Sequence, residues 1–317
     1  RDPLWSRGLG DVYKRQALLF AACANEEDGI GNNGPVAATV QADISKTVTR
    51  ATIGNTWTLN DAIGVYAVSD GITNVDNKKY VVTDVKGTFD AADDQNIIFF
   101  KDPKNVTFSA YYPYSATLAD GKMNWKMAEV VENEPCTADV LFASGATASK
   151  SSPVVKFEQK GDADNRFKHC MSLVKFVIKP GAGIDDNYLE GIYLKNIYQE
   201  GLFDTKKGTI EPTFKRYNYF HPFKENFTEN KSFEIVMLPQ SLEGNQLEIE
   251  LDLTDNESLV TNRYKTTLYP STDCEFKGGY KYTYNITVKN TGITIENANI
   301  IPWENGDSSD LDADIAL

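Results

Sequence analysis

The chain is poor in the residues that most catalytic and metal sites require. It has two histidines, His169 and His221, and four cysteines among 317 residues. Neither histidine lies in an HExxH motif or a metal-spaced cluster, and Gly-x-Ser-x-Gly, phosphate-cradling glycine-rich and Cys-x-x-Cys motifs are absent. We therefore expect no enzymatic activity, no cofactor and no metal ion. His169 is expected to be partly buried with a hydrogen-bond partner, and His221, beside Pro222, is expected in a loop.

Basic residues and long apolar runs are also scarce. Lys and Arg number 32 against 45 Asp and Glu, which gives a net charge of −13 and a pI near 4.7. Nucleic-acid binding requires clustered basic side chains, so a nucleic-acid partner is not expected. No apolar run is long enough to span a bilayer. The acids at Asp307, Asp310, Asp312 and Asp314 lack the glycine and terminal glutamate of an EF-hand, and we interpret them as solvated.

The position of one cysteine predicts attachment to a membrane outside the cytoplasm. A short apolar run from Ala17 ends at Cys23 and is followed by a polar, glycine-bearing stretch to residue 35. This pattern is typical of a bacterial lipoprotein signal and tether, with the lipid on Cys23. The alternative is a buried cysteine that ends an ordinary strand. Residues 1–16 begin without methionine and fit a signal badly, so we interpret them as an expression or assembly scar.

The remaining cysteines limit the number of disulfides. Once Cys23 is set aside, Cys136, Cys170 and Cys274 cannot all pair within one chain. Three buried free thiols are the favoured interpretation, and a single bridge is the alternative.

Apolar residues alternate with polar ones along most of the chain, whereas helical periodicity is nearly absent. The clearest runs are at 36–44, 63–66, 106–112, 173–178, 247–253 and 280–288. Such runs, separated by short polar turns, predict an all-β protein built from antiparallel sandwiches. A polar, serine-rich stretch at 143–152 predicts a boundary between an N-terminal domain, 36–152, and a C-terminal domain, 153–317.

Several segments in a fixed order resemble the fimbrillin-like family of the Bacteroidales, whose members include subunits, anchors and tips of type V pili. The matching residues are Thr49–Ala51, Trp57, Asp61–Tyr66, Val106–Tyr114, Ala138–Leu141, Phe167–His169, Leu238–Gln240, Gly278–Val288 and Ile300–Trp303. Asn60 stands where the family usually has glycine, and residues 161–165 look like an insertion. The match covers about 255 residues.

The resemblance implies two transthyretin-like β-sandwich domains, export as a lipoprotein to the outer membrane and cell surface, and polymerisation after an arginine-specific, trypsin-like protease cuts the chain. On this sequence the cut falls between Arg50 and Ala51. It would release the strand that carries the alternating residues Val36, Ala38, Val40, Ala42 and Ile44. An unpaired sheet edge would remain, which a strand from another pilus subunit could fill.

The end of the chain has the pattern that a donated strand requires. Leu311, Ala313, Ile315 and Leu317 alternate with two aspartates and an alanine. A frayed acidic tail is the equally weighted alternative.

The sequence is compatible with three functions. The leading hypothesis is a structural or accessory pilus subunit that polymerises with other subunits. The second is a monomeric surface lipoprotein, or a tip adhesin, that binds a glycan or a host or bacterial surface ligand; Trp57, Trp125 or Trp303 could then contact sugar, although tryptophan in a sandwich is more often core. The third, a secreted hydrolase, rests only on abundant acids.

Overall fold

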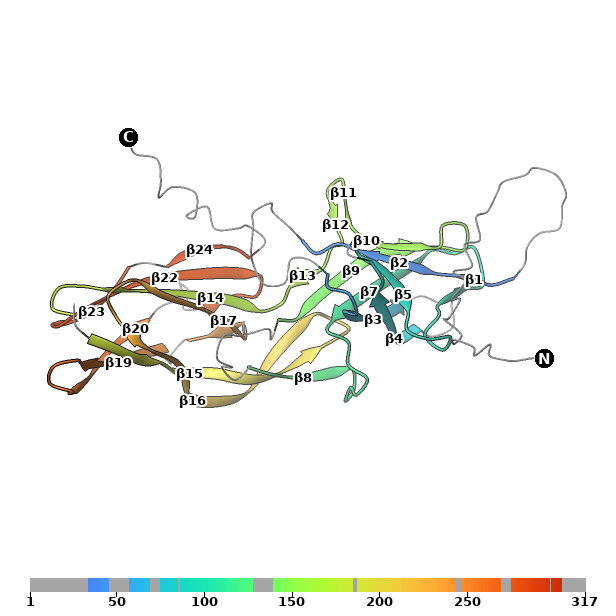
Figure 1. The fold of residues 1–317 in the computed structure, drawn as a ribbon. Helices are drawn as coiled ribbons and strands as arrows, with labels where there is room; N and C mark the ends of the chain where they lie inside the picture. The colour runs from blue at the N-terminus through green and yellow to red at the C-terminus, as the bar shows by residue number, and fades with distance from the viewer. Residues whose placement is uncertain are drawn as a thin grey trace, which may run out of the picture. The chain divides into compact units, whose positions relative to one another are not determined.

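The computed structural model describes residues 34–45, 57–68, 75–84, 86–127, 139–184, 187–242, 247–268, 275–296 and 298–303. Twenty-four β-strands make up the regular structure of these ranges (Figure 1). The predicted all-β class is confirmed. Within the same ranges, no helix is long and apolar enough to cross a membrane.

Eight strands form what we call the first sheet. Neighbours are antiparallel, except that β10 runs parallel to β2. In spatial order, the strands are β10 (Val154–Phe157), β2 (Thr39–Ala42), β5 (Thr88–Ala91), β4 (Val75–Val82), β3 (Ala62–Val68), β7 (Val106–Tyr112), β9 (Leu141–Ala148) and β13 (Lys168–His169). Two short pairs accompany it, β1 (Val36–Ala37) with β6 (Phe99–Phe100) and β11 (Gln159–Lys160) with β12 (Ala163–Asp164).

The first sheet closes on itself. Beyond β2, Ile44 forms a parallel bridge with Phe167, the residue directly before β13. Because β13 is the last strand of the sheet order and β2 lies next to its other end, this bridge joins the two ends around a buried core. The core is apolar, with Val40, Phe89, Phe157 and Phe167 fully buried.

Two further sheets form layers on either side of a second core (Figure 1). The second sheet has the order β17 (Lys231–Met237), β14 (Ser172–Pro180), β22 (Tyr280–Lys289) and β23 (Gly292–Ile295), with β24 (Asn299–Pro302) also paired to β22. The third sheet has the order β16 (Thr209–Asn226), β15 (Asn187–Asp204), β19 (Leu247–Asp255) and β20 (Thr261–Leu268), with β8 (Lys122–Lys126) also paired to β15. A short pair joins β18 (Gln240–Ser241) to β21 (Glu275–Phe276).

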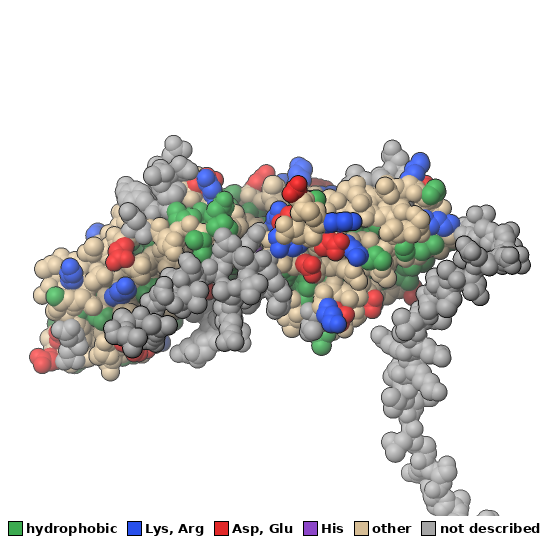
Figure 2. All heavy atoms as spheres, turned by 90° about the horizontal axis from the view of Figure 1, so that it is seen from above, with side chains coloured by type: hydrophobic (Ala, Val, Ile, Leu, Met, Phe, Trp, Pro, Cys, Tyr) green, Lys and Arg blue, Asp and Glu red, His purple; other side chains and the backbone are tan. Residues whose placement is uncertain are grey.

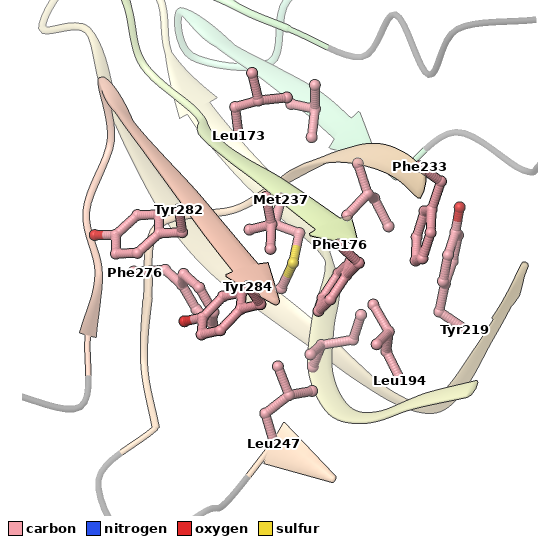
Figure 3. Packing of buried hydrophobic residues seen from close by; sticks show 14 of the residues in the cluster. Leu173, Phe176, Leu194, Tyr219, Phe233, Met237, Leu247, Phe276, Tyr282 and Tyr284 are labelled. Carbon is pink, nitrogen blue, oxygen red and sulfur yellow. The ribbon is translucent and has the colours of Figure 1, made fainter. Parts of the chain in front are cut away.

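Alternating residues of the second and third sheets meet in the core that Figure 3 shows. Phe176 from β14 stacks on Phe233 and Tyr284, with ring centroids 5.0 and 5.7 Å apart. Leu194 and Leu247 approach from the third sheet and are fully buried. The period of two seen in the sequence therefore directs every second side chain into this core.

Strand pairing connects the two halves of the chain around the predicted domain boundary. β10 and β13 follow residue 153, yet they pair with β2 and β9 of the first sheet. β8 precedes the boundary and pairs with β15 of the third sheet. The Tyr66 hydroxyl also lies 2.7 Å from the Thr205 hydroxyl. The boundary at 152/153 stays a prediction, and the pairing places β10 and β13 in the first sheet.

One histidine lies where the sequence did not lead us to expect it. His221 belongs to β16, opposite Ile192 of β15, so its expected place in a loop is wrong. Pro222, which suggested the loop, is tolerated because β16 is the edge strand and the pairing shifts register between Leu189 and Gly191. The His221 ring stacks on Phe233, with centroids 4.2 Å apart.

Candidate functional site

The most informative site is the place that residues 36–45 occupy in the first sheet; we call these residues the first segment and the place they fill the groove. Val40 is fully buried, Ala38, Ala42 and Ile44 are 7%, 2% and 4% exposed, and Val36 is half-buried. Thr39, Gln41 and Asp43 are exposed. The alternation in the sequence thus corresponds to an apolar face that fills the core.

Backbone hydrogen bonds hold the first segment on both sides. β2 lies between β5 and β10, so neither of its edges faces solvent. The N–H groups of Ala38, Thr39, Ala42, Asp43 and Ser45 donate to the carbonyls of Ile98, Pro153, Gly87, Phe157 and Phe167 over 2.8–3.1 Å. The Phe167 N–H in turn donates to the Asp43 carbonyl at 2.9 Å. The contacts on both sides make the first segment an inner strand of a closed sheet.

A tryptophan continues this ladder beyond the start of β5. The Trp57 indole N–H donates to the Ala42 carbonyl at 2.7 Å. Its rings pack edge-on against Phe89, Tyr112 and Phe167, with centroids 5.0, 5.6 and 5.1 Å apart. The indole is 6% exposed, so neighbouring rings fix its position under the strand.

The close approach at Ala42 also depends on a glycine. Gly87 has a φ of +82°, a conformation that side chains other than hydrogen disfavour. A Cβ placed there would lie 2.2 Å from the Ala42 carbonyl oxygen. Gly87 therefore lets the turn before β5 reach the backbone of the first segment.

The other predicted site residues lie outside the described residues. These are Cys23, Arg50, Ala51, Leu311, Ala313, Ile315 and Leu317, together with Cys136 and Cys274. Cys170 is described and forms no disulfide, and burial raises the pKa of its thiol. In the sequence, Arg50 falls between Ser45, which ends the described part of the first segment, and Trp57.

The tryptophans considered for sugar binding are core residues. Trp57, Trp125 and Trp303 are 6%, 5% and 2% exposed. Trp303 stacks on His169 with ring centroids 4.1 Å apart, and His169 Nδ1 lies 2.6 Å from Asp139 Oδ2. The expected hydrogen-bond partner of His169 is therefore present, and its side chain is fully buried.

A cavity of about 300 Å³ lies beside β13. Among its lining residues, Arg166 Nε contacts Asp164 at 2.8 Å and Lys168 Nζ contacts the same carboxylate at 3.5 Å. The hydrogen bond from Arg166 lowers the pKa of Asp164. No sequence motif marks this cavity, because its walls come from separate strands. On the face drawn in Figure 2, acidic and basic side chains are intermixed rather than gathered into one basic surface. Among the described residues, no group of His, Cys, Asp and Glu is placed to hold a metal ion.

Comparison with known proteins assigns the family. The model of the fimbrillin-like family matches residues 49–303. The chain belongs to the fimbrillin-like family. A candidate fimbrium subunit of Bacteroides uniformis, Fim1C, is 26% identical over 315 residues, which cover 92% of this chain and 96% of that protein.

Solved structures support the fold of this fimbrillin-like chain. A candidate cell adhesion protein from Bacteroides ovatus superposes with a TM-score of 0.67 at 21% identity, covering 86% of this chain and all of that one. Another from Bacteroides uniformis gives a TM-score of 0.62 at 23% identity, covering 85% of this chain and 99% of that one. At these identities the likeness concerns the fold alone.

Proposed function

We propose that this protein is a subunit of a cell-surface pilus, assembled by replacement of its first segment. It is exported as a lipoprotein through Cys23 and cut after Arg50 by an arginine-specific protease. The C-terminal residues of another copy, or of another subunit, then enter the groove. Family membership and the fimbrium subunit similar to this chain support a role in a pilus.

The observation that carries the proposal is the position of the first segment. It is an inner strand that closes the first sheet, yet it lies near the N-terminal end of the chain, before Arg50. One peptide-bond cleavage therefore separates an apolar strand from the core that it completes. The exposed edges of β5 and β10 would each present unpaired backbone groups, which favour pairing with another strand.

The experiment is limited cleavage of the purified precursor with an arginine-specific protease, followed by gel analysis with and without boiling. We expect a ladder that resists detergent unboiled and collapses on heating. Arg50→Ala should abolish both the cut and the ladder, whereas deletion of residues 309–317 should keep the cut and abolish the ladder. A trimmed chain that stays monomeric with its C-terminus intact contradicts polymerisation by this route.

The cavity beside β13 favours a second candidate, binding of a small surface ligand. Arg166 and Lys168 bring two positive charges to one carboxylate, which suits a ligand with hydroxyl or acidic groups. Saturable binding to an oligosaccharide array that Arg166→Gln removes would support it, with Lys175→Gln on β14 as a matched loss of charge. Binding that both variants retain would remove the cavity from consideration.

A further inference from the structure

At one place in the groove, a small buried side chain lies at the residue that Trp57 holds by a hydrogen bond. Ala42 is 2% exposed and belongs to the same buried cluster as Trp57, Phe89 and Phe167. The indole of Trp57 is held against the backbone of this residue by the 2.7 Å hydrogen bond to its carbonyl. Because three aromatic rings pack edge-on around the indole, it has little freedom to move away from a larger side chain.

We infer that Trp57 sets the register of the strand that replaces the first segment. In that register Leu311, Ala313 and Ile315 take the places of Val40, Ala42 and Ile44, and the Ala313 carbonyl accepts the indole N–H. This inference rests on the proposed function, since it describes how the donated strand lies in the groove.

Backbone pairing by itself cannot choose the register. A strand shifted by two residues presents the same hydrogen-bonding groups and the same alternation to its neighbours. A shift of two residues in either direction, however, would place Leu311 or Ile315 against Trp57 at the position of Ala42. Within residues 311–317, Ala313 is the small residue on the apolar face, because Ala316 alternates with the aspartates on the other face.

The remaining positions agree with this register and with one direction. Ser309 would lie at Ala38, which is 7% exposed and has a small side chain. Insertion in the reverse direction would put Leu317 there instead. Asp312 would take the exposed place of Gln41, whose partner on β10 is Lys156, so opposite charges would face each other across the strands.

Disulfide trapping tests the register directly. Gln41 lies opposite Thr88 of β5, and paired residues on antiparallel strands have Cα atoms about 4.5–5.5 Å apart, within reach of a disulfide. The test chain is the full precursor with Cys136, Cys170 and Cys274 replaced by serine and with Thr88→Cys added. Asp312→Cys is then introduced, and Asp310→Cys and Asp314→Cys serve as controls shifted by two residues.

After cleavage and mild oxidation, we expect Asp312→Cys to give a ladder that survives boiling without reductant and collapses with it. The two controls should form a ladder that boiling still collapses. Preferential cross-linking of Asp310→Cys or Asp314→Cys overturns the inference while leaving strand replacement intact. Absence of any ladder from the serine-substituted parent, when the wild-type chain is equally unable to form one, overturns the proposed function itself.

A pair of substitutions tests the role of the small side chain. Ala313→Leu should reduce the yield of ladder at least tenfold, because the larger side chain meets the indole. Ala316→Leu, on the opposite face of the same segment, should leave the yield unchanged. Equal assembly by the two variants would show that the place of Ala42 does not select the register.

Discussion

The first sheet and the pair formed by the second and third sheets depend on very different parts of the chain. The first sheet is closed by the first segment. This segment buries two branched aliphatic side chains, Val40 and Ile44, and two alanines in the core of the sheet. The second core, by contrast, is built from long strands such as β15 and β16, of 18 residues each. Among the described residues, no member of the first segment belongs to that second core. We therefore expect release of the first segment to destabilise the first sheet and to leave the second and third sheets unaffected.

The largest expected difference between the sheets follows from release of the first segment, which should destabilise the first sheet alone. Cleavage after Arg50 in a chain that lacks residues 309–317 should leave the groove empty. Burial of Val40 and Ile44 contributes about 1.5–3 kcal/mol each, so on the order of 3–6 kcal/mol is lost in addition to the backbone hydrogen bonds. Hydrogen exchange followed by mass spectrometry should show β5 and β10 exchanging at least tenfold faster, with β15 and β19 unchanged. Equal acceleration in all four strands would mean that the sheets do not differ as we describe.

A cavity in the second core should destabilise the protein whether or not the first segment is present. Phe176 is fully buried between Phe233 and Tyr284. Phe176→Ala should lower the free energy of unfolding of the second and third sheets by about 3–5 kcal/mol. Urea unfolding of intact and cleaved chains measures it, and the loss should be the same in both. A loss confined to the intact chain would show that the two cores are coupled.

Truncating an anchor of the first segment should affect the intact chain alone. Ile44 is 4% exposed, and Ile44→Ala should lower the free energy of unfolding of the first sheet by about 2–5 kcal/mol. If cleavage releases the first segment, as we propose, the stability of the cleaved chain should not respond. Thr39→Ala, at an exposed position of the same strand, is the matched control and should change stability by less than about 0.5 kcal/mol. A response of the cleaved chain to Ile44→Ala would mean that the first segment stays bound after cleavage.

Local patterns in the sequence were sufficient to predict the strands but not their partners. The alternation from Val36 to Ile44 predicted a strand with one buried face, because side chains in a strand point to opposite sides whatever its neighbours are. That this strand closes the first sheet depends on Phe167, more than a hundred residues away, and no local signal identifies such a partner. The fimbrillin-like family could be predicted because its short motifs occur in a fixed order.

The details of the groove and the place of His221 could not be predicted for the same reason. The hydrogen bond from Trp57 to Ala42 and the approach of Gly87 exist only once β2 and β5 have paired. Pro222 favours a loop on local grounds, but the edge of the third sheet tolerates it because no further strand needs its missing N–H there. Tertiary pairing therefore overrode the local preference at this histidine.

The smallest effect that we expect is a dependence on pH of the stability of the second and third sheets, which contain His221 and its stacking partner Phe233. Burial lowers the pKa of His221 below 6.5, because stacking on Phe233 removes the imidazole from water. Just below pH 6.5, His221 therefore binds a proton more readily in the unfolded chain than in the folded protein. The contribution of the neutral His221 to the stability of the second and third sheets is fully present above pH 6.5. It is lost as the pH falls through the lowered pKa.

His221→Phe keeps an aromatic ring against Phe233 and removes the titration. Thermal unfolding of the cleaved chain between pH 7.5 and 5.5 should show a falling melting temperature for the second and third sheets that this substitution flattens. Lys289→Gln, at an exposed position at the end of β22, is the control and should leave the slope unchanged. An unchanged slope in His221→Phe would show that other groups cause the response to acid, and the second core would then owe none of its pH dependence to the histidine that stacks on it.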